Sequence, residues 1–438
     1  MKKIFKRAVT SVLALVLFSA FTIQYASAQE NTVSVRDFLV APSQYTNMEN
    51  FGVHIEKTIN GSSSIVSLGN FGGYVIYEFE NPVYDSDTHK FGVDFIVTGN
   101  AFAAVASAQE PGQVWVSKDG DKWYALAGSE HFEDGTLWNY SLTYSKNPEN
   151  ELRCNYSDSL GDINMPVSEK TASRYPNASI YTLADIPEDN LTLSGILLKK
   201  ARLSSTDNVI VTKFGYVDTL KSAGNGESFN PYLENYANDC RDGQFDIAWA
   251  VKSDGSPANL DYIKYVKVQT AAFIDSGAFG EKSTEVTSIR NVNEVEKVGV
   301  TAAPASITVN GEALDLTGGE SVFNVPVSDS GYTVSADTNA NVYINNAFGC
   351  ERVFDKAPDK GIIRVIVQSD DSEPLIYYIN IPTEGGTQPP ADDEPVEEFH
   401  CSHICHKNGL LKLIWKILNT FFRLLNINSV CECGLKHY

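Results

Sequence analysis

The sequence contains none of the short motifs that mark the common catalytic sites. It has no Gly-x-Ser-x-Gly, no His-Glu-x-x-His and no phosphate-binding P-loop. Between residues 29 and 399 only His54, His89 and His131 could act as imidazole bases, and they lie in unrelated polar surroundings. A carboxylate pair for glycoside hydrolysis stays open, because sequence spacing does not set the separation of two side chains in a β-sandwich. We therefore predict a protein that is not an enzyme, with a glycan-active hydrolase as the alternative.

Positive charge is scarce outside the two ends of the chain. The sequence has 34 Lys and Arg against 55 Asp and Glu, a net charge of −21. Four of these cations lie within residues 1–28 and five within residues 400–438. The acidic middle argues against nucleic acid as a partner and suits hard cations such as calcium. With 20% charged and 43% hydrophobic residues, the chain should bury a core.

Long apolar segments are confined to the two ends. Four cations within the first seven residues precede an apolar stretch at residues 8–23, and the small residues Ala26-Ser27-Ala28 follow. This order is typical of a cleaved signal peptide, which we predict at residues 1–28. An uncleaved membrane anchor is the alternative, but four Ser and Thr residues interrupt the apolar stretch. The protein is therefore expected to be secreted.

The second apolar segment, residues 410–427, has a helical pattern. Its polar residues are spaced four, three, four and three apart, at Lys412, Lys416, Asn419, Arg423 and Asn426. This spacing predicts an amphipathic helix within a tail at residues 400–438. A helix in the membrane plane avoids the burial of Lys416 in the bilayer core, and packing on a partner is the alternative. The side chains expected to contact the membrane are Leu411, Ile414, Trp415, Leu418, Phe421, Phe422 and Leu425.

The chain has only seven cysteines, and four of them flank this helix. Since export favours disulfides, we predict that they clasp the helix through disulfide bonds. Zinc binding with His403, His406 or His437 is the alternative. Cys154 and Cys240 are candidates for a further bridge, which would leave Cys350 odd. The cysteines of the predicted clasp are Cys401, Cys405, Cys431 and Cys433.

Before the tail, the chain lacks sustained helical patterns and alternates with a period of two. Residues 74–79, 92–97, 113–117 and 262–268 are rich in β-branched and aromatic residues. Lys118-Asp119-Gly120-Asp121 predicts a tight hairpin turn. We predict an all-β fold, with a jelly-roll or β-sandwich binding domain at residues 30–285.

A second group of short strands follows a polar stretch. Their spacing predicts an immunoglobulin-like β-sandwich at residues 298–383. Residues 384–399 are rich in proline, glycine and acidic residues, which indicates an extended linker before the tail.

Two groups of residues are candidate binding sites. Asp239, Asp242 and Asp246 lie close together before a strand and could bind calcium, with an ordinary turn as the alternative. Trp115, Trp123, Tyr124 and Trp138 belong to an aromatic cluster that could stack on sugar rings, although such residues are more often core. Strand alternation places Trp115 on the face opposite to its neighbours, so at least one ring is expected outside. Asn100 and Glu110 complete the predicted ligand-binding set.

Several short segments of the first domain carry a resemblance to a known family. They are residues 40–47 (VAPSQYTN), 67–73 (SLGNFGG), 98–102 (TGNAF), 110–112 (EPG), 123–130 (WYALAGSE), 245–251 (FDIAWAV) and 280–286 (GEKSTEV). These segments resemble a little-characterised family of secreted bacterial surface proteins with a jelly-roll-like domain. The departures are PSQY at residues 42–45, where the family has PGQF, and GYVDT at residues 215–219, where it has GYADN. The resemblance implies a surface or nutrient-capture protein and carries no established activity.

The other parts of the chain have resemblances of their own. Residues 298–383 resemble the cadherin-like repeats of bacterial surface proteins, which usually act as spacers. The tail, with CECG at residues 431–434 and a final His437-Tyr438, resembles carboxy-terminal segments of Firmicutes surface proteins. These resemblances imply a cell-surface location on a Gram-positive bacterium, with the tail as the attachment to the envelope.

We therefore expect a non-catalytic protein that captures a glycan or a small molecule at the cell surface. A structural adhesin that binds a host or matrix protein is the second alternative, beside the hydrolase.

Overall fold

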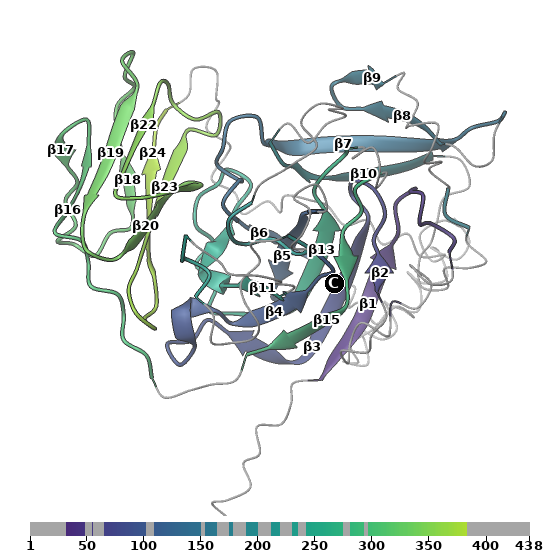
Figure 1. The fold of residues 1–438 in the computed structure, drawn as a ribbon, viewed down its shortest axis with the longest axis horizontal. Helices are drawn as coiled ribbons and strands as arrows, with labels where there is room; N and C mark the ends of the chain where they lie inside the picture. Colours follow the sequence, from purple (N-terminus) through teal and green to yellow (C-terminus); the bar gives the residue numbers. More distant parts are fainter. Residues whose placement is uncertain are drawn as a thin grey trace, which may run out of the picture. The chain divides into compact units, whose positions relative to one another are not determined.

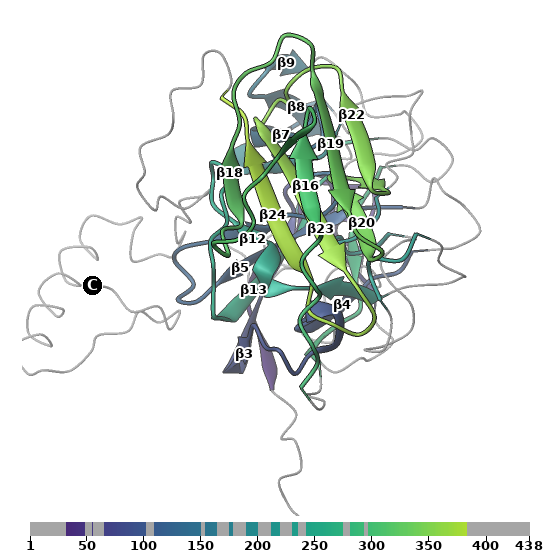
Figure 2. The same cartoon turned by 90° about the vertical axis from the view of Figure 1, so that its left-hand side faces the viewer.

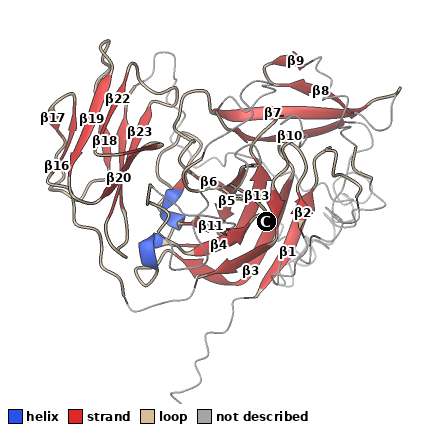
Figure 3. Cartoon of the chain, in the orientation of Figure 1, coloured by secondary structure: helices blue, strands red, loops and turns tan. Residues whose placement is uncertain are grey.

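The computed structural model describes the chain from Thr32 to Pro382, with gaps. The described residues are 32–48, 55, 65–101, 109–149, 154–163, 175–177, 190–199, 212–219, 230–234, 242–274, 281–292 and 297–382. Almost all regular structure within these ranges is β. The helical turns Lys90–Gly92 and Ile247–Trp249 have three residues each (Figure 3). None of the described residues belongs to a helix that is long and apolar enough to cross a bilayer.

The first part of the fold, which we call the N-terminal module, is built on a six-stranded antiparallel sheet. Its strand order is β1-β3-β13-β5-β6-β12, and Figure 1 labels all of these strands except β12. The middle strands are long and rich in Val, Ile and Tyr, as a sheet that is buried on both faces requires. The bounds are β1 (Val33–Leu39), β3 (Tyr74–Tyr84), β13 (Tyr262–Thr270), β5 (Gly112–Ser117), β6 (Tyr124–Leu126) and β12 (Ala250–Val251).

Three smaller sheets complete the N-terminal module. The four-stranded sheet packs on the first one, where Gln269 Nε2 of β13 donates to Ser194 O at 2.9 Å. Its order is β10 (Asn190–Leu197), β7 (Leu137–Lys146), β8 (Cys154–Asp158) and β9 (Gly161–Ile163). The other sheets are β11 (Asp242–Phe245), β4 (Phe95–Thr98) and β15 (Ser288–Asn291), and the pair β14 (Glu285–Val286) and β2 (Val66–Ser67).

The predicted hairpin at residues 118–121 is confirmed. β5 and β6 pair antiparallel, with Trp115 opposite Ala125 and Val116 opposite Tyr124. The turn is closed by Asp119, whose Oδ1 accepts the N–H groups of Asp121 and Lys122, both at 2.9 Å. Local turn chemistry therefore sets this connection.

The second part of the fold, the C-terminal sandwich, has two sheets and its own core. Figure 2 looks onto its strands. Ile307, Val334, Ile363 and Val365 are fully buried within that core. Every pair is antiparallel except β18 with β24. One sheet is β17 (Glu312–Ala313), β16 (Ser306–Val309), β19 (Tyr332–Asp337) and β22 (Glu351–Phe354); the other is β18 (Val322–Asn324), β24 (Leu375–Asn380), β23 (Ile362–Gln368), β20 (Asn341–Ile344) and β21 (Ala347–Phe348).

The two parts share one buried cluster. Tyr343, Ile362, Ile366 and Tyr378 of the C-terminal sandwich belong to the same apolar core as the N-terminal module. The C-terminal sandwich therefore packs on the N-terminal module through residues of its strands. The strands of both parts confirm the all-β prediction.

Several sequence-based predictions fall outside the described residues. These are the signal peptide at 1–28, the linker at 384–399, and the tail with its helix, its four cysteines and its membrane-contacting side chains.

The predicted Cys154–Cys240 bridge does not form, because Cys154 is a free thiol, and burial raises its pKa to about 12. Cys350 is also free and is exposed.

Candidate cation and ligand site

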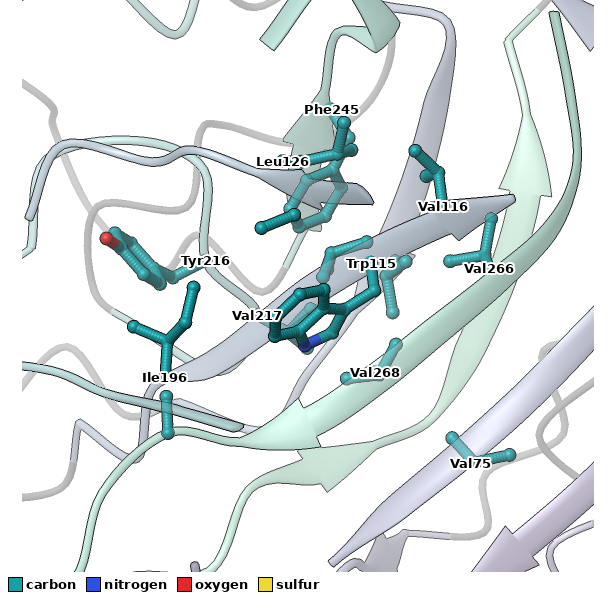
Figure 4. Packing of buried hydrophobic residues seen from close by; sticks show 14 of the residues in the cluster. Val75, Trp115, Val116, Leu126, Ile196, Tyr216, Val217, Phe245, Val266 and Val268 are labelled. Atoms are coloured by element: carbon teal, nitrogen blue, oxygen red, sulfur yellow. The ribbon is translucent and has the colours of Figure 1, made fainter. Parts of the chain in front are cut away.

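The predicted aromatic cluster lies in the core. Trp115 is 0% exposed, Trp123 1% and Trp138 8%, while Tyr124 is half-buried. The expectation that one ring would lie outside is wrong for Trp115, because every residue of β5 is buried. β5 pairs with β13 and β6, and both faces of this sheet are covered, so alternation no longer separates inside from outside (Figure 4).

The faces of these rings are already in contact with a side chain of the protein. Lys267 on β13 is fully buried, and its Nζ lies 4.9 Å from the ring centroid of Trp115. The rings of Trp123 and Tyr74 are 5.9 Å and 5.8 Å from the same ammonium group. Aromatic faces attract cations at such distances. The three rings therefore stabilise Lys267, and the two buried tryptophans offer no free surface to a sugar.

Two other predicted ligand-binding residues, Asn100 and Glu110, meet at a different place. Glu110, Asp218 and Glu285 each place one carboxylate oxygen within 4.8 Å of those of the other two. Asp218 and Glu285 are buried and Glu110 is half-buried. We call these three residues the carboxylate site.

Backbone pairing between distant segments builds the carboxylate site. Glu110 N donates to Asp218 O at 3.0 Å, and a β-bridge joins Gly112 to Val217. Glu285 is the first residue of β14, and its backbone N–H donates to Asp218 Oδ2 at 2.9 Å. The loops before β5 and after Val217 are therefore joined by their backbones, and β14 is joined to them through the Asp218 carboxylate.

Backbone donors also orient the carboxylates. Asp218 Oδ1 accepts the Asn100 N–H at 2.7 Å, so Asn100 contributes its backbone to the site. Glu110 Oε1 accepts the Ser283 N–H at 3.3 Å, and Thr284 Oγ1 donates to Glu110 O at 2.8 Å. Such contacts leave little freedom to the side chains.

The carboxylate site concentrates negative charge in a buried place. Burial and the neighbouring Glu110 raise the pKa of Asp218 to about 7. Burial raises the pKa of Glu110, and burial with the two other carboxylates holds that of Glu285 well above its usual range. The Lys282 ammonium, which is fully buried, donates to Gln109 O at 2.6 Å. Three carboxylates with one ammonium leave a deficit of two positive charges, which a divalent cation would fill.

The donor set fits a hard cation. Calcium is bound in proteins by carboxylate and carbonyl oxygens, and these three carboxylates are already within reach of one centre. Burial also disfavours their simultaneous ionisation unless a cation is bound. The residues present therefore fit calcium.

The predicted metal residues Asp239, Asp242 and Asp246 do not assemble as expected. Asp239 and the side chain of Asp242 lie outside what the structure describes. Asp246 instead lies within 4.8 Å of Asp85 and Asp94.

This second group of carboxylates is engaged by the protein's own donors. Asp246 Oδ1 accepts the Ala248 N–H at 2.7 Å and so caps the turn at Ile247–Trp249. Asp94 Oδ2 accepts the Ile247 N–H at 2.8 Å, and its Oδ1 lies 2.7 Å from His89 Nδ1. These contacts explain the position of Asp246 without a metal, and the carboxylate site is the better candidate.

The sequence-based interpretation missed Asp218, Lys282 and Glu285. Asp218 lies in GYVDT at residues 215–219, Lys282 and Glu285 lie in GEKSTEV at 280–286, and Glu110 lies in EPG at 110–112. The recurrence of an acidic residue in each of these segments was the available signal. Chain separation of more than 100 residues between Glu110 and Asp218 hid their proximity.

The sequence of the chain matches no protein-family profile and no curated protein.

Proposed function

We propose that this chain is a secreted, non-catalytic protein that binds its ligand through a calcium ion held at the carboxylate site. The proposal rests on one observation, the convergence of Glu110, Asp218 and Glu285 within 4.8 Å beside a single buried lysine. A bound calcium ion can accept hydroxyl or carboxylate oxygens from outside as further ligands. The ligand class is therefore a glycan or a small molecule rich in such oxygens.

Tyr45 offers an aromatic surface beside the carboxylate site. Its side chain is half-buried. Burial and the nearby carboxylates of Glu110 and Glu285 raise its pKa to about 12. The phenol therefore stays neutral, and a partly exposed ring beside a cation is a combination that suits a sugar.

The wider proposal keeps the predicted setting. The N-terminal module would be a jelly-roll-like binding domain and the C-terminal sandwich an immunoglobulin-like one. A signal peptide at residues 1–28 would direct secretion, and the tail at 400–438 would hold the protein at the surface of a Gram-positive cell.

The test is a calcium titration of the mature chain, residues 29–438, by calorimetry, followed by a glycan panel with calcium or with EDTA. We expect calcium binding that Glu285→Gln abolishes, and glycan binding that requires calcium. Glu312→Gln is the matched control, because Glu312 is an exposed carboxylate on β17.

Three outcomes would contradict the proposal. Calcium binding that survives Glu285→Gln would remove the cation from the carboxylate site. Cleavage of a panel glycan would favour the hydrolase instead. A folded protein that binds calcium but no glycan or small molecule would favour the adhesin.

A further inference from the structure

One loop of the N-terminal module is held by two strands and by loop residues of the C-terminal sandwich. We call residues 127–136, between β6 and β7, the docking loop. Arg364 of β23 is fully buried and donates through Nη2 to Gly128 O at 2.9 Å and through Nη1 to Ala127 O. Asn345, which follows β20, donates through Nδ2 to Phe132 O at 3.1 Å.

Charged groups add to this contact. Arg352 of β22 forms two hydrogen bonds with Glu133, at 2.6 Å and 2.9 Å. Gly135 N donates to Asp359 Oδ2 at 3.1 Å, and Asp359 N donates to Asp134 Oδ1 at 2.8 Å. The docking loop is therefore bound through both its backbone and its acidic side chains.

Glu130 in the middle of the docking loop has a different environment from Glu133. It is 2% exposed, and its two carboxyl oxygens accept the Asn346 amide at 3.1 Å and 3.3 Å. The Ser129 hydroxyl donates to the same carboxyl at 3.1 Å. Across the described residues, no lysine or arginine nitrogen forms an ion pair with it within 4.0 Å. Neutral donors from both sides of the contact thus surround a buried carboxyl group.

The charged and titratable groups that face Glu130 are few. Glu133 repels it from within the loop, and Lys199, beyond β10, attracts it weakly. His131 accepts the Gly128 N–H through Nδ1 at 3.0 Å, and burial with Arg364 lowers its pKa to about 3, so it stays neutral. Burial keeps the pKa of Tyr216 well above its usual range. Arg364 and Arg352 are committed to the carbonyl groups and to Glu133.

We propose that Glu130 makes the docking of the C-terminal sandwich depend on a proton: the docked contact holds the carboxylic acid, and it weakens when this group ionises. The Asn346 and Ser129 donors favour the ionised group, but burial and Glu133 outweigh them, because a carboxylate would be buried beside Glu133 without a counter-ion in contact. The sandwich is then docked more firmly in mildly acidic surroundings than in alkaline ones.

The direction follows from proton linkage. Burial and Glu133 raise the pKa of Glu130 to about 7, against about 4.3 for an exposed glutamate. At pH values between these two pKa values, the docked state holds a proton on Glu130 that the undocked state has lost. Docking is therefore firmest below about pH 4.3 and weakens as the pH rises to about 7. Above that value the dependence flattens.

Hydrogen exchange of the mature chain, with rates corrected for the intrinsic effect of pH, tests this proposal. We expect the protection factors of the docking loop and of β23 to fall by as much as about 100-fold between pH 5 and pH 8. Glu130→Gln, which imitates the protonated acid in shape, should flatten this dependence on pH to the part that other buried carboxyl groups, such as Glu373, contribute. At pH 8 this variant should be better protected than the wild type.

Asp134→Asn is the matched control. Asp134 lies in the same loop but is exposed, so this variant should keep the wild-type dependence on pH. The proposal is overturned if the wild-type protection does not change with pH, or if Glu130→Gln retains the wild-type slope. It is also overturned if Asp134→Asn removes the slope as completely as Glu130→Gln does.

Discussion

At the scale of single residues, the burial of a charge explains what the aromatic cluster does. Lys267 lies fully buried with its ammonium group over Trp115, Trp123 and Tyr74. A buried cation needs compensating contacts, and three ring faces supply part of them. The tryptophans are therefore expected to contribute to stability, and their replacement should leave ligand binding intact.

Replacement of Trp115 by phenylalanine checks this role. We expect Trp115→Phe to lower the free energy of unfolding by roughly 1–3 kcal/mol, because a smaller ring leaves a cavity and withdraws a face from Lys267. Denaturant unfolding measures the loss, with Tyr84→Phe on the exposed end of β3 as the control. A variant that keeps full stability but loses glycan binding would show that Trp115 contacts the ligand.

A second residue-scale prediction concerns Arg364. Arg364→Met should lower the free energy of unfolding by about 2–5 kcal/mol, since the carbonyls of Ala127 and Gly128 lose their buried donors. Thermal or urea unfolding measures the effect. Lys356→Met, which removes an exposed cation from the same contact region, should change little. An equal decrease in the free energy of unfolding in the two variants would mean that the buried hydrogen bonds of Arg364 stabilise the fold no more than an exposed cation does.

At the scale of elements, the carboxylate site depends on how closely two loops approach. A Cβ atom on Gly99 would lie 2.6 Å from Asp218 Cα, which is backbone and cannot move aside cheaply. Asp218 itself has a φ of 60°, so this turn is already restrained. A glycine at position 99 is therefore required for the approach of β4 to the loop that carries Asp218.

Gly99→Ala is expected to weaken calcium binding by roughly 10- to 100-fold, because it displaces the backbone that orients a ligand residue. Calorimetry measures the affinity. Gly318→Ala, at an exposed position where a Cβ meets only Glu320 at 3.8 Å, is the control and should bind as the wild type does. Unchanged affinity in Gly99→Ala would separate Asp218 from the binding of the cation.

Calcium binding to the same elements should release protons near neutral pH. The pKa of Asp218 is raised to about 7 and that of Glu285 lies well above its usual range, so the free site is partly protonated at pH 7. Because calcium needs the ionised carboxylates, its apparent affinity should rise about tenfold per pH unit for each proton released. Titrations in two buffers with different ionisation enthalpies count the protons, and a count of zero would contradict the proposed site.

At the scale of the whole molecule, buried carboxyl groups set the response of stability to pH. Burial, together with neighbouring carboxylates for the last three, raises the pKa of Asp85 to about 6, of Glu130 and Asp218 to about 7, and of Glu373 to about 8. Each group binds its proton more tightly in the folded chain than in the unfolded one. The folded state is therefore favoured by protons in the range between the unfolded and the folded pKa values.

The melting temperature of the calcium-free protein is thus expected to fall as the pH rises from about 5 to about 8, the interval in which these groups ionise. Calorimetric melting in EDTA measures this trend. Addition of calcium at pH 8 should restore part of the loss, since the cation binds the ionised carboxylate site. A melting temperature that rises steadily across this interval in EDTA would show that these carboxyl groups are already ionised when folded.

The sequence alone determined what depends on neighbouring residues. Period-two alternation and β-branched composition identified an all-β chain, and Asp119-Gly120 identified the hairpin between β5 and β6, because both signals act within a few residues. An acidic residue at position 110 was also singled out, although its partners were not.

Only the tertiary structure decided which surfaces are covered. Trp115 is inside because sheets that are distant in sequence close over both faces of β5, and alternation along one strand contains no information about that closure. Glu110, Asp218 and Glu285 meet because hydrogen bonds join segments that are more than 60 residues apart in the chain. Burial and convergence are non-local, so the core, the carboxylate site and the docked sandwich could be found only in three dimensions.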